Sequence, residues 1–382
     1  MRIALEAAAA FAVRRHGLVP GTAFSSADEA AAAVLGLHAQ LMTSAAMSAA
    51  ARVPGYDRAR FDDDLYRRRS LVKAWCMRGT LHLLAARDFG LALAAIMRKR
   101  AAEQRDFLTR CGFGAAEIDA LAGRVARALE DGPATRKRLH ELVPELRRIP
   151  DAQWGQDVKD LCYQGLVVHA EPDGNEARFA RAGAWLSGPP AEVPPEAATA
   201  ELLRRYLHAY GPASLADFAS WAGFDVTVTG AAARQRLGDA VREVEVEGYT
   251  RPLLLLSADE DALARVEPLP AAFPLPRFDP LIMGLKDRRR FVGDEWRQRL
   301  LLPGGFVAAT LWSAGRVVGI WDFQVRGGRM IVEAAAFRGL TAAERSGLIA
   351  GWQSLAPALG ATVVEARFNE WQKGAGKTVK EG

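Results

Sequence analysis

Two polar side chains, His38 and Gln40, stand two residues apart in a short segment that is otherwise apolar. Ser26-Ala27-Asp28-Glu29 has the pattern of a capping box and Gly36 suits a helix end, so this segment should follow a helix. Residues i and i+2 lie on the same side of an extended chain but on opposite sides of a helix. An extended segment would therefore project both groups together as uncharged hydrogen-bonding groups. The simpler alternative, which physics alone favours, is a solvent-facing pair in a connecting loop.

The sequence contains no pattern typical of a metal-binding or nucleotide-binding site. The three cysteines and six histidines lack ligand spacing, so we expect no structural metal. Gly374 to Thr378 imitates part of a phosphate-binding loop, but Trp371 stands where its first glycine is required. Asp62-Asp63-Asp64 opens a helix that ends in three arginines, which complements the helix dipole. We therefore expect neither a metal nor a nucleotide cofactor.

The composition is that of an ordinary globular protein with a mildly basic balance. Half of the 382 residues are hydrophobic, a quarter are charged and the net charge is +5, which excludes a disordered or collagen-like chain. No apolar stretch is long enough to span a bilayer. The apolar run at the N-terminus imitates a secretion signal, but Glu6 interrupts it, so we expect a cytoplasmic protein without a membrane partner. Of the 50 Lys and Arg residues only eight are Lys. Arginine suits bidentate phosphate contact, although a GC-rich codon usage accounts for the excess equally well.

Two nearly identical tetrapeptides mark an internal repeat: Gly132-Pro133-Ala134-Thr135 and Gly211-Pro212-Ala213-Ser214. Each follows a helical run, and Thr135 and Ser214 are residue types that begin a helix. Each unit then ends in a hairpin pattern, which makes the order of a winged helix-turn-helix. The expected elements are helices at 115–130, 138–143 and 152–164 with strands at 166–171 and 176–180, then helices at 197–210, 215–222 and 230–241 with strands at 243–247 and 252–256.

The N-terminal third fits a third, less regular copy, and the C-terminal part turns to β structure. Helices are expected at 2–16, 27–35, 44–52 and 62–68, strands at 71–77 and 81–85, and a helical run at 86–107. Pro-rich segments at 187–195 and 267–276 indicate linkers. Strands at 306–313, 317–325 and 330–337 and a helix at 342–354 should follow, and the last dozen residues, with Lys373, Lys377 and Lys380, should be a loose tail. We predict an α+β, mainly α fold of tandem winged helix-turn-helix motifs with a β-rich C-terminal portion, divided at 1–114, 115–190, 196–265 and 272–382.

Two groups of residues are suited to bind phosphates, as a nucleic-acid partner would require. Arg78-Gly79-Thr80 occupies the tip of the first predicted hairpin, where an arginine and turn amides can bind phosphates. Arg288, Arg289 and Arg290 form the second group, for which a solvated turn after Leu285 is the alternative.

Several segments together resemble the AlkZ-type family of DNA glycosylases, and they extend in order over nearly the whole chain. The resemblance implies winged-helix motifs and a β-rich portion, C-shaped around a basic DNA channel, which agrees with the repeat. It also implies excision of alkylated purines from duplex DNA, chiefly guanines substituted at N7, including bulky natural-product adducts and interstrand crosslinks. Some members of the family provide self-resistance in antibiotic producers. The segments are Gly36 to Gln40, Trp75 to His82, Tyr206 to Ser214, Phe278 to Leu281 and Gly315 to Trp321.

The catalytic signature of that family is Gln-x-Gln, in which Gln40 matches the second glutamine and His38 replaces the first. The resemblance therefore makes His38 and Gln40 the catalytic candidates and adds His82 to the DNA-binding candidates. An N7-alkylated purine is cationic and leaves easily, so the enzyme must chiefly stabilise an oxocarbenium-like sugar and place a water. We expect a monomeric, monofunctional DNA glycosylase whose partner is damaged duplex DNA. The alternatives are a non-catalytic winged-helix DNA-binding protein and a protein that sequesters a small molecule or antibiotic.

Overall fold

The computed structural model describes residues 2–150, 155–224, 226–269 and 272–370. The predicted helices and hairpin of the N-terminal third are present, except that the first helix begins at Leu5 because Arg2–Ile3 forms a strand. Two π-helical stretches, Asp63–Arg67 and Leu93–Met97, continue neighbouring helices. The elements are β1 (Arg2–Ile3), α1 (Leu5–Arg15), α2 (Ala27–Ala33), β2 (Leu37–His38), α3 (Met42–Ala50), α4 (Arg58–Asp62), β3 (Leu71–Trp75), β4 (Leu81–Ala85), α5 (Phe89–Ala92) and α6 (Arg98–Arg110).

The N-terminal hairpin and the hairpin of the next unit form one sheet of six strands, in the order β2-β4-β3-β6-β7-β5. The two hairpins join at the pairing of Lys73 on β3 with His169 on β6. The sheet is therefore continuous across the predicted boundary at residue 114. The second unit consists of α7 (Ala115–Ala128), β5 (Ala134–Thr135), α8 (Arg136–Leu142), α9 (Gln156–Tyr163), β6 (Val167–Asp173), β7 (Glu176–Arg181) and α10 (Ala182–Trp185).

The two repeated units have their elements in the predicted order. Thr135 and Ser214 cap the helices that follow them, because each hydroxyl accepts a bond from the backbone N–H three residues on, at 3.1 Å. The two repeat glycines differ, with φ of +128° at Gly132 and −64° at Gly211. The third unit consists of α11 (Pro195–Tyr210), α12 (Leu215–Ala222), α13 (Val226–Leu237), β8 (Val241–Val246), β9 (Leu253–Leu256) and α14 (Glu260–Ala264), and β1 pairs with β8.

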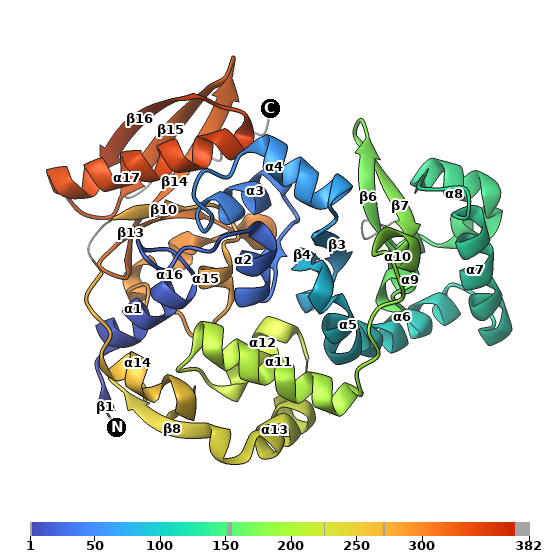
Figure 1. Ribbon diagram of the computed structural model, residues 1–382, viewed down its shortest axis with the longest axis horizontal. Helices are drawn as coiled ribbons and strands as arrows, with labels where there is room; N and C mark the ends of the chain where they lie inside the picture. Colours follow the sequence, from blue (N-terminus) through green and yellow to red (C-terminus); the bar gives the residue numbers. More distant parts are fainter. Residues whose placement is uncertain (1, 151–154, 225, 270–271, 371–382) are drawn as a thin grey trace.

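A five-stranded sheet in the order β10-β13-β14-β15-β16 forms the C-terminal portion, and α17 lies across it (Figure 1). The linker prediction is wrong at Phe273–Leu275, which forms the edge strand β10 against β13. Strand β16 was not predicted; it follows α17 and runs parallel to β15, so α17 is the crossover between the two strands. The predicted tail, with Lys373, Lys377 and Lys380, lies outside the described residues. The elements are β10 (Phe273–Leu275), α15 (Pro280–Met283), α16 (Asp294–Leu300), β11 (Leu301–Leu302), β12 (Phe306–Val307), β13 (Ala309–Ser313), β14 (Arg316–Arg326), β15 (Arg329–Ala336), α17 (Ala342–Leu355) and β16 (Val363–Glu370).

Candidate active site

The segment after α2 is extended, as Gly36 predicted. Ser26 caps α2 by accepting a bond from the N–H of Glu29, although the Glu29 carboxylate bonds Ser25 instead of closing the expected capping box. Leu35 and Gly36 then have φ of +61° and +109°, which turns the chain out of the helix. A Cβ on Gly36 would lie 3.0 Å from two buried side chains, so the close approach also favours glycine. Strand β2 then pairs with β4, with His38 opposite His82.

His38 and Gln40 differ sharply in exposure. The side chain of His38 is only 5% exposed, whereas Gln40 is exposed and Ala39 between them is fully buried. Leu37 and Ala39 pack into one core cluster, so His38 stands on the opposite side of the strand. The predicted extended backbone is present from Leu37 to Ala39, whose N–H donates to the carbonyl oxygen of Leu81, and Gln40 follows in a bend. The segment presents a buried imidazole and an accessible amide two residues apart.

Two rings enclose the imidazole of His38. Phe278 stacks on it with ring centroids 4.5 Å apart and planes at 17°. His82 meets it nearly at a right angle, at 5.2 Å and 79°. Phe306 in turn contacts Phe278 at 5.4 Å. No role was predicted for Phe278. The available signal was its place directly before an Asp-Pro pair, which predicts the helix start observed at Pro280.

Burial keeps both histidines neutral. Desolvation, with a smaller contribution from the charge of Arg78, lowers the pKa of His38 to about 4. The pKa of His82 is also well below its usual value, chiefly through desolvation and further through the charges of His38 and Arg78. Nδ1 of His82 lies 3.0 Å from the carbonyl oxygen of Thr80. A neutral imidazole retains one nitrogen that can accept a hydrogen bond from a water or hydroxyl.

The tip of the β3–β4 hairpin is docked against the third unit rather than free. Arg78 has a φ of +54°, and its Nη1 donates to the carbonyl oxygen of Trp221 at 2.7 Å. Gly223 lies so close that a Cβ there would be 2.8 Å from the Cα of Arg78. Desolvation lowers the pKa of Arg78, and the charge of Arg288 lowers it further. Arg78, Gly79 and Thr80 are partly buried, so the tip is a packed corner beside His82.

The predicted basic turn at residues 288–290 is tied into the protein, so the alternative of a purely solvated turn is wrong. Arg290 is 1% exposed and its guanidinium donates to the carbonyl oxygens of Tyr210 and Pro212. Arg288 is partly buried, and its Nε donates to the carbonyl oxygen of Ile282 at 2.7 Å. Arg289 pairs with the carboxylate of Asp287 at 2.9 Å. The three arginines therefore have three different environments.

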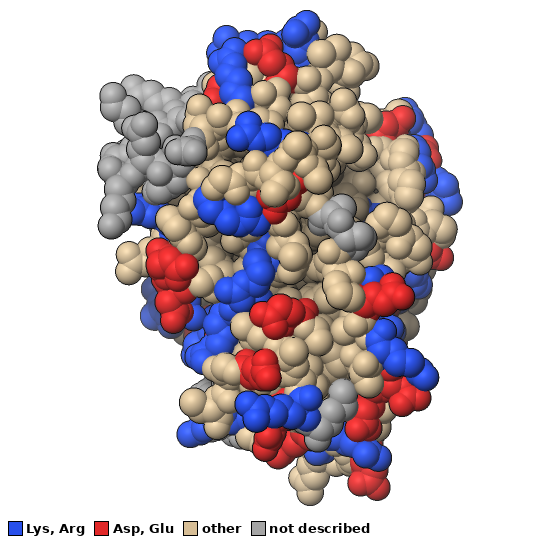
Figure 2. Space-filling view, turned by 90° about the vertical axis from the view of Figure 1, so that its left-hand side faces the viewer, with Lys and Arg blue, Asp and Glu red and all other residues tan. Residues whose placement is uncertain are grey.

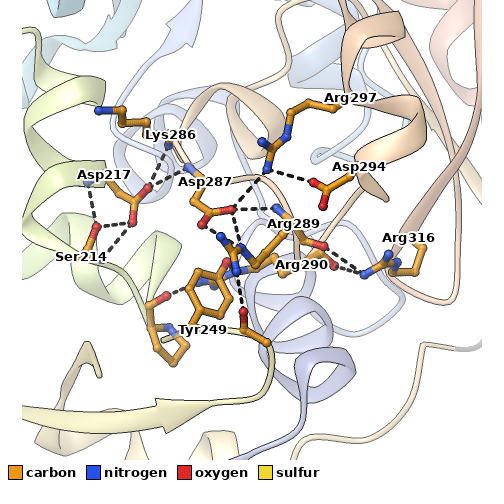
Figure 3. A network of polar contacts seen from close by, with 12 residues as sticks. Ser214, Asp217, Tyr249, Lys286, Asp287, Arg289, Arg290, Asp294, Arg297 and Arg316 are labelled. Carbon is orange, nitrogen blue, oxygen red and sulfur yellow. Dashed lines mark hydrogen bonds and ion pairs between the residues drawn. The ribbon is translucent and has the colours of Figure 1, made fainter. Parts of the chain in front are cut away.

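Asp217 on α12 holds the backbone before these arginines (Figure 3). Its buried carboxylate accepts bonds from the N–H groups of Lys286 and Asp287, at 2.9 and 3.0 Å. The other carboxylate oxygen accepts from the hydroxyl and N–H of Ser214. Because Trp221, which binds Arg78, is on the same helix, α12 positions both predicted DNA-binding groups.

A buried ion pair anchors the segment that carries Phe278. The two terminal nitrogens of the Arg52 guanidinium, Nη1 and Nη2, donate to Asp279, each at 2.8 Å, and both side chains are fully buried. Asp279 also accepts from the N–H of Leu281 at 3.0 Å, which caps α15. Such bidentate pairs restrict geometry more strongly than single hydrogen bonds. The sequence carried no signal that Arg52 would find its partner so far along the chain.

Within the described ranges, His, Cys, Asp and Glu side chains nowhere gather in a group of three or more that would hold a metal ion. Among the same residues, none of the helices is both long and apolar enough to cross a membrane. On the face drawn in Figure 2, Lys and Arg side chains run in a broken band between Asp and Glu side chains. That face is therefore mixed in sign rather than uniformly basic.

Comparisons with known proteins agree with this fold. The family model described as DNA glycosylase AlkZ-like matches residues 31–358. An interstrand DNA cross-link repair glycosylase of Streptomyces sahachiroi is 28% identical over 323 residues, covering 82% of this chain and 86% of that protein. The solved structure of Streptomyces sahachiroi DNA glycosylase AlkZ superposes with a TM-score of 0.83 at 25% identity, covering 97% of this chain and 100% of the other. The chain belongs to the AlkZ-like DNA glycosylase family, which makes it a DNA repair enzyme of mixed α+β fold.

Proposed function

We propose that this protein hydrolyses the N-glycosidic bond of N7-alkylguanine in duplex DNA, and that its natural substrates are bulky adducts or crosslinks. The observation that carries the proposal is the pairing of a neutral, buried His38 with the exposed Gln40 on one extended segment. The crosslink repair name of the Streptomyces relative supports the choice of lesion class. A role in antibiotic self-resistance would follow if the adduct derives from a natural product.

The chemistry needs little from the protein. The alkylated base carries a positive charge and departs as a neutral leaving group, while the sugar gains oxocarbenium character. Gln40 offers a carbonyl oxygen that can hold the attacking water or face the developing positive charge. His38 offers a neutral acceptor for that water, and a protonated imidazole there would repel the cationic sugar. The proposed reaction is hydrolysis alone, without a lyase step, a metal or a nucleotide cofactor.

Arg78 and Arg288 are the phosphate contacts that the geometry supports best. Desolvation lowers the pKa of each side chain, and the positive charge of Arg288 lowers the pKa of Arg78 further. In the described part of the chain, neither guanidinium forms an ion pair with a carboxylate, so each retains its charge for a phosphate. Gly79 and Thr80 adjoin Arg78 and complete this part of the proposed surface. The prediction of His82 as a DNA contact does not fit its burial, because His82 is only 2% exposed and packs against His38. Arg289 is the weaker candidate, because Asp287 already neutralises it.

The larger arrangement follows the family. We propose that the three units are winged-helix motifs, divided at 114–115, 190–196 and 265–272, and that they form a C-shaped channel around the duplex. A monomer is sufficient for this arrangement, because the candidate residues all come from one chain. The reaction belongs in the compartment that holds the DNA, which for a bacterial protein is the cytoplasm.

Base release tests the proposal. Purified protein is incubated with a duplex that contains one N7-methylguanine, and then with a duplex that carries a bulky N7 adduct, under single-turnover conditions. We expect free modified base and alkali-labile sites, with faster release from the adduct. Tight DNA binding without release from either duplex would favour the non-catalytic DNA-binding protein instead.

A further inference from the structure

We propose that Phe278 is the positioning residue of His38: its ring lies along one face of the imidazole, sets the plane of that ring and excludes water from it. The activity part of this inference rests on the proposed function. The stacking distance of 4.5 Å and the interplanar angle of 17° are those of rings in direct contact. Phe278 itself is only 6% exposed, so it forms part of a closed wall.

Ring packing alone holds the imidazole of His38. No hydrogen bond to it is found among the described residues, and its Nδ1 is buried without a partner. Histidines at functional sites are ordinarily oriented by a hydrogen bond from the second ring nitrogen to a carboxylate or carbonyl. His82 has such a bond, to Thr80, but His38 has none. The flat contact with Phe278 and the edge contact with His82 are what remains to fix the ring.

The backbone at Phe278 is built to present its side chain. Phe278 has a φ of +58°, a left-handed conformation that a bulky residue adopts only when its surroundings impose it. The next residue, Asp279, is fixed by Arg52 and by the N–H of Leu281. The rigid neighbour therefore imposes the strained conformation, and that conformation directs the ring onto His38.

Phe278 also controls whether the imidazole of His38 can be protonated. The charged and titratable groups near the imidazole are Arg78 and His82, and Arg52 neutralises the carboxylate of Asp279. None of these groups stabilises an imidazolium. Removing the aromatic ring would admit water, and hydration favours the charged form. Phe278 thereby couples the orientation of His38 to its protonation state.

Phe278→Leu tests the proposal, because leucine keeps an apolar side chain but removes the flat face. The titration of His38 is followed by NMR of histidine-labelled full-length protein, with His38→Gln to assign the signal. We expect the His38 pKa to rise from about 4 toward 6.5. The single-turnover excision rate at pH 5.5 should fall on the order of 10- to 100-fold, with DNA affinity unchanged. Phe278→Tyr keeps the ring and should restore both values.

Phe273→Leu is the matched control, because Phe273 stacks on Trp312 with planes at 7° as part of another ring pair. It should lower stability without moving the His38 titration. The proposal is overturned if folded Phe278→Leu titrates and excises like wild type, or if Phe273→Leu produces the same changes. The NMR titration does not depend on catalysis. If wild-type protein released no base, the proposed function would be refuted, and the titration would still test the effect of Phe278 on His38.

Discussion

Arg52 and Asp279, 227 positions apart in the sequence, form a bidentate ion pair that is shut off from solvent. Ser48 joins them through its hydroxyl, which donates to Asp279 at 3.1 Å, and through its carbonyl oxygen, which accepts from Arg52 at 2.9 Å. The pair connects the segment directly after α3 in the N-terminal third with the N-cap of α15 in the C-terminal portion. A single polar cluster thus joins the part of the chain that carries His38 to the part that carries Phe278.

Arg52→Ala should lower the free energy of unfolding by about 3–5 kcal/mol, because it leaves the Asp279 carboxylate buried without a counter-charge. Urea unfolding followed by circular dichroism measures the change. Arg58→Ala is the control, since Arg58 forms an exposed pair with Asp62 and should cost at most about 1 kcal/mol. Equal losses in the two variants would contradict the assigned role of the buried pair.

Gln40→Ala should slow base excision by about 100-fold or more, because it removes the carbonyl oxygen that we propose holds the water or faces the sugar. DNA affinity should change little, since Gln40 carries no charge and therefore contributes nothing to the counterion release that dominates DNA binding. Single-turnover rates and fluorescence anisotropy separate the two effects. Gln353→Ala, at an exposed position of α17, is the matched control and should have neither effect. Excision by Gln40→Ala at the wild-type rate would remove Gln40 from the mechanism.

The excision rate of wild type should be nearly the same at pH 5.5 and pH 7.5 as far as His38 is concerned. With a pKa of about 4, its imidazole is still neutral at pH 5.5. A histidine with an ordinary pKa near 6.5 would instead be about nine-tenths protonated at that pH, which predicts a roughly tenfold slower reaction. A tenfold fall that disappears in His38→Gln would show that His38 titrates normally. The same fall persisting in His38→Gln would assign it to another group.

Protein stability should decrease as the pH falls from 6.5 toward 4. His16, His38, His82 and His169 all have folded-state pKa values below the usual one, chiefly because burial disfavours the charged form. The unfolded chain therefore binds more protons in this window, and stability present above pH 6.5 is lost on acidification. Each such histidine contributes up to about 1.4 kcal/mol per pH unit.

Urea midpoints at pH 7.5, 6.0 and 5.0 measure this dependence. In His169→Phe the slope of unfolding free energy against pH should be smaller by one histidine's contribution. The variant should still fold, because phenylalanine can contact the same two aromatic rings as His169. A stability that does not change across this range would contradict the prediction.

Arg78→Gln and Arg288→Gln should each weaken DNA binding and reduce the slope of log affinity against log salt by about 1. Arg289→Gln should reduce it by less, because its charge is already paired with Asp287. Anisotropy titrations over a range of salt concentrations give the three slopes. Identical slopes in all variants and wild type would remove both partly buried arginines from the DNA surface.

Local signals predicted most of the helices, strands and caps. Thr135 and Ser214 cap their helices because the interaction spans only three residues, which a sequence pattern can contain. The extended conformation at His38 was predictable for the same reason, since Gly36 ends the preceding helix locally. The arrangement of units as winged helices remains a prediction.

Long-range relationships were not predictable from the chain alone. The Pro-rich composition around Phe273 indicated a linker, but the residue sits in an edge strand, where a proline is tolerated because one side of the strand is unpaired. The arginines at 288–290 looked alike in sequence and differ because Asp287, Ile282 and Pro212 lie beside different members. The stacking of Phe278 on His38 depends on the buried ion pair, and no local sequence pattern could predict that Arg52 pairs with Asp279.

The separation of Arg52 and Asp279 also sets an order of events on the ribosome. At roughly 5–20 residues per second, some 10–45 seconds of translation lie between the two residues. During that interval the Arg52 guanidinium has no Asp279 carboxylate to pair with, and the imidazole of His38 lacks its stacking partner Phe278. The buried contacts around His38 can therefore form only after the C-terminal portion has been synthesised. A nascent chain that stalls before residue 279 leaves these side chains exposed to water and to cellular proteases.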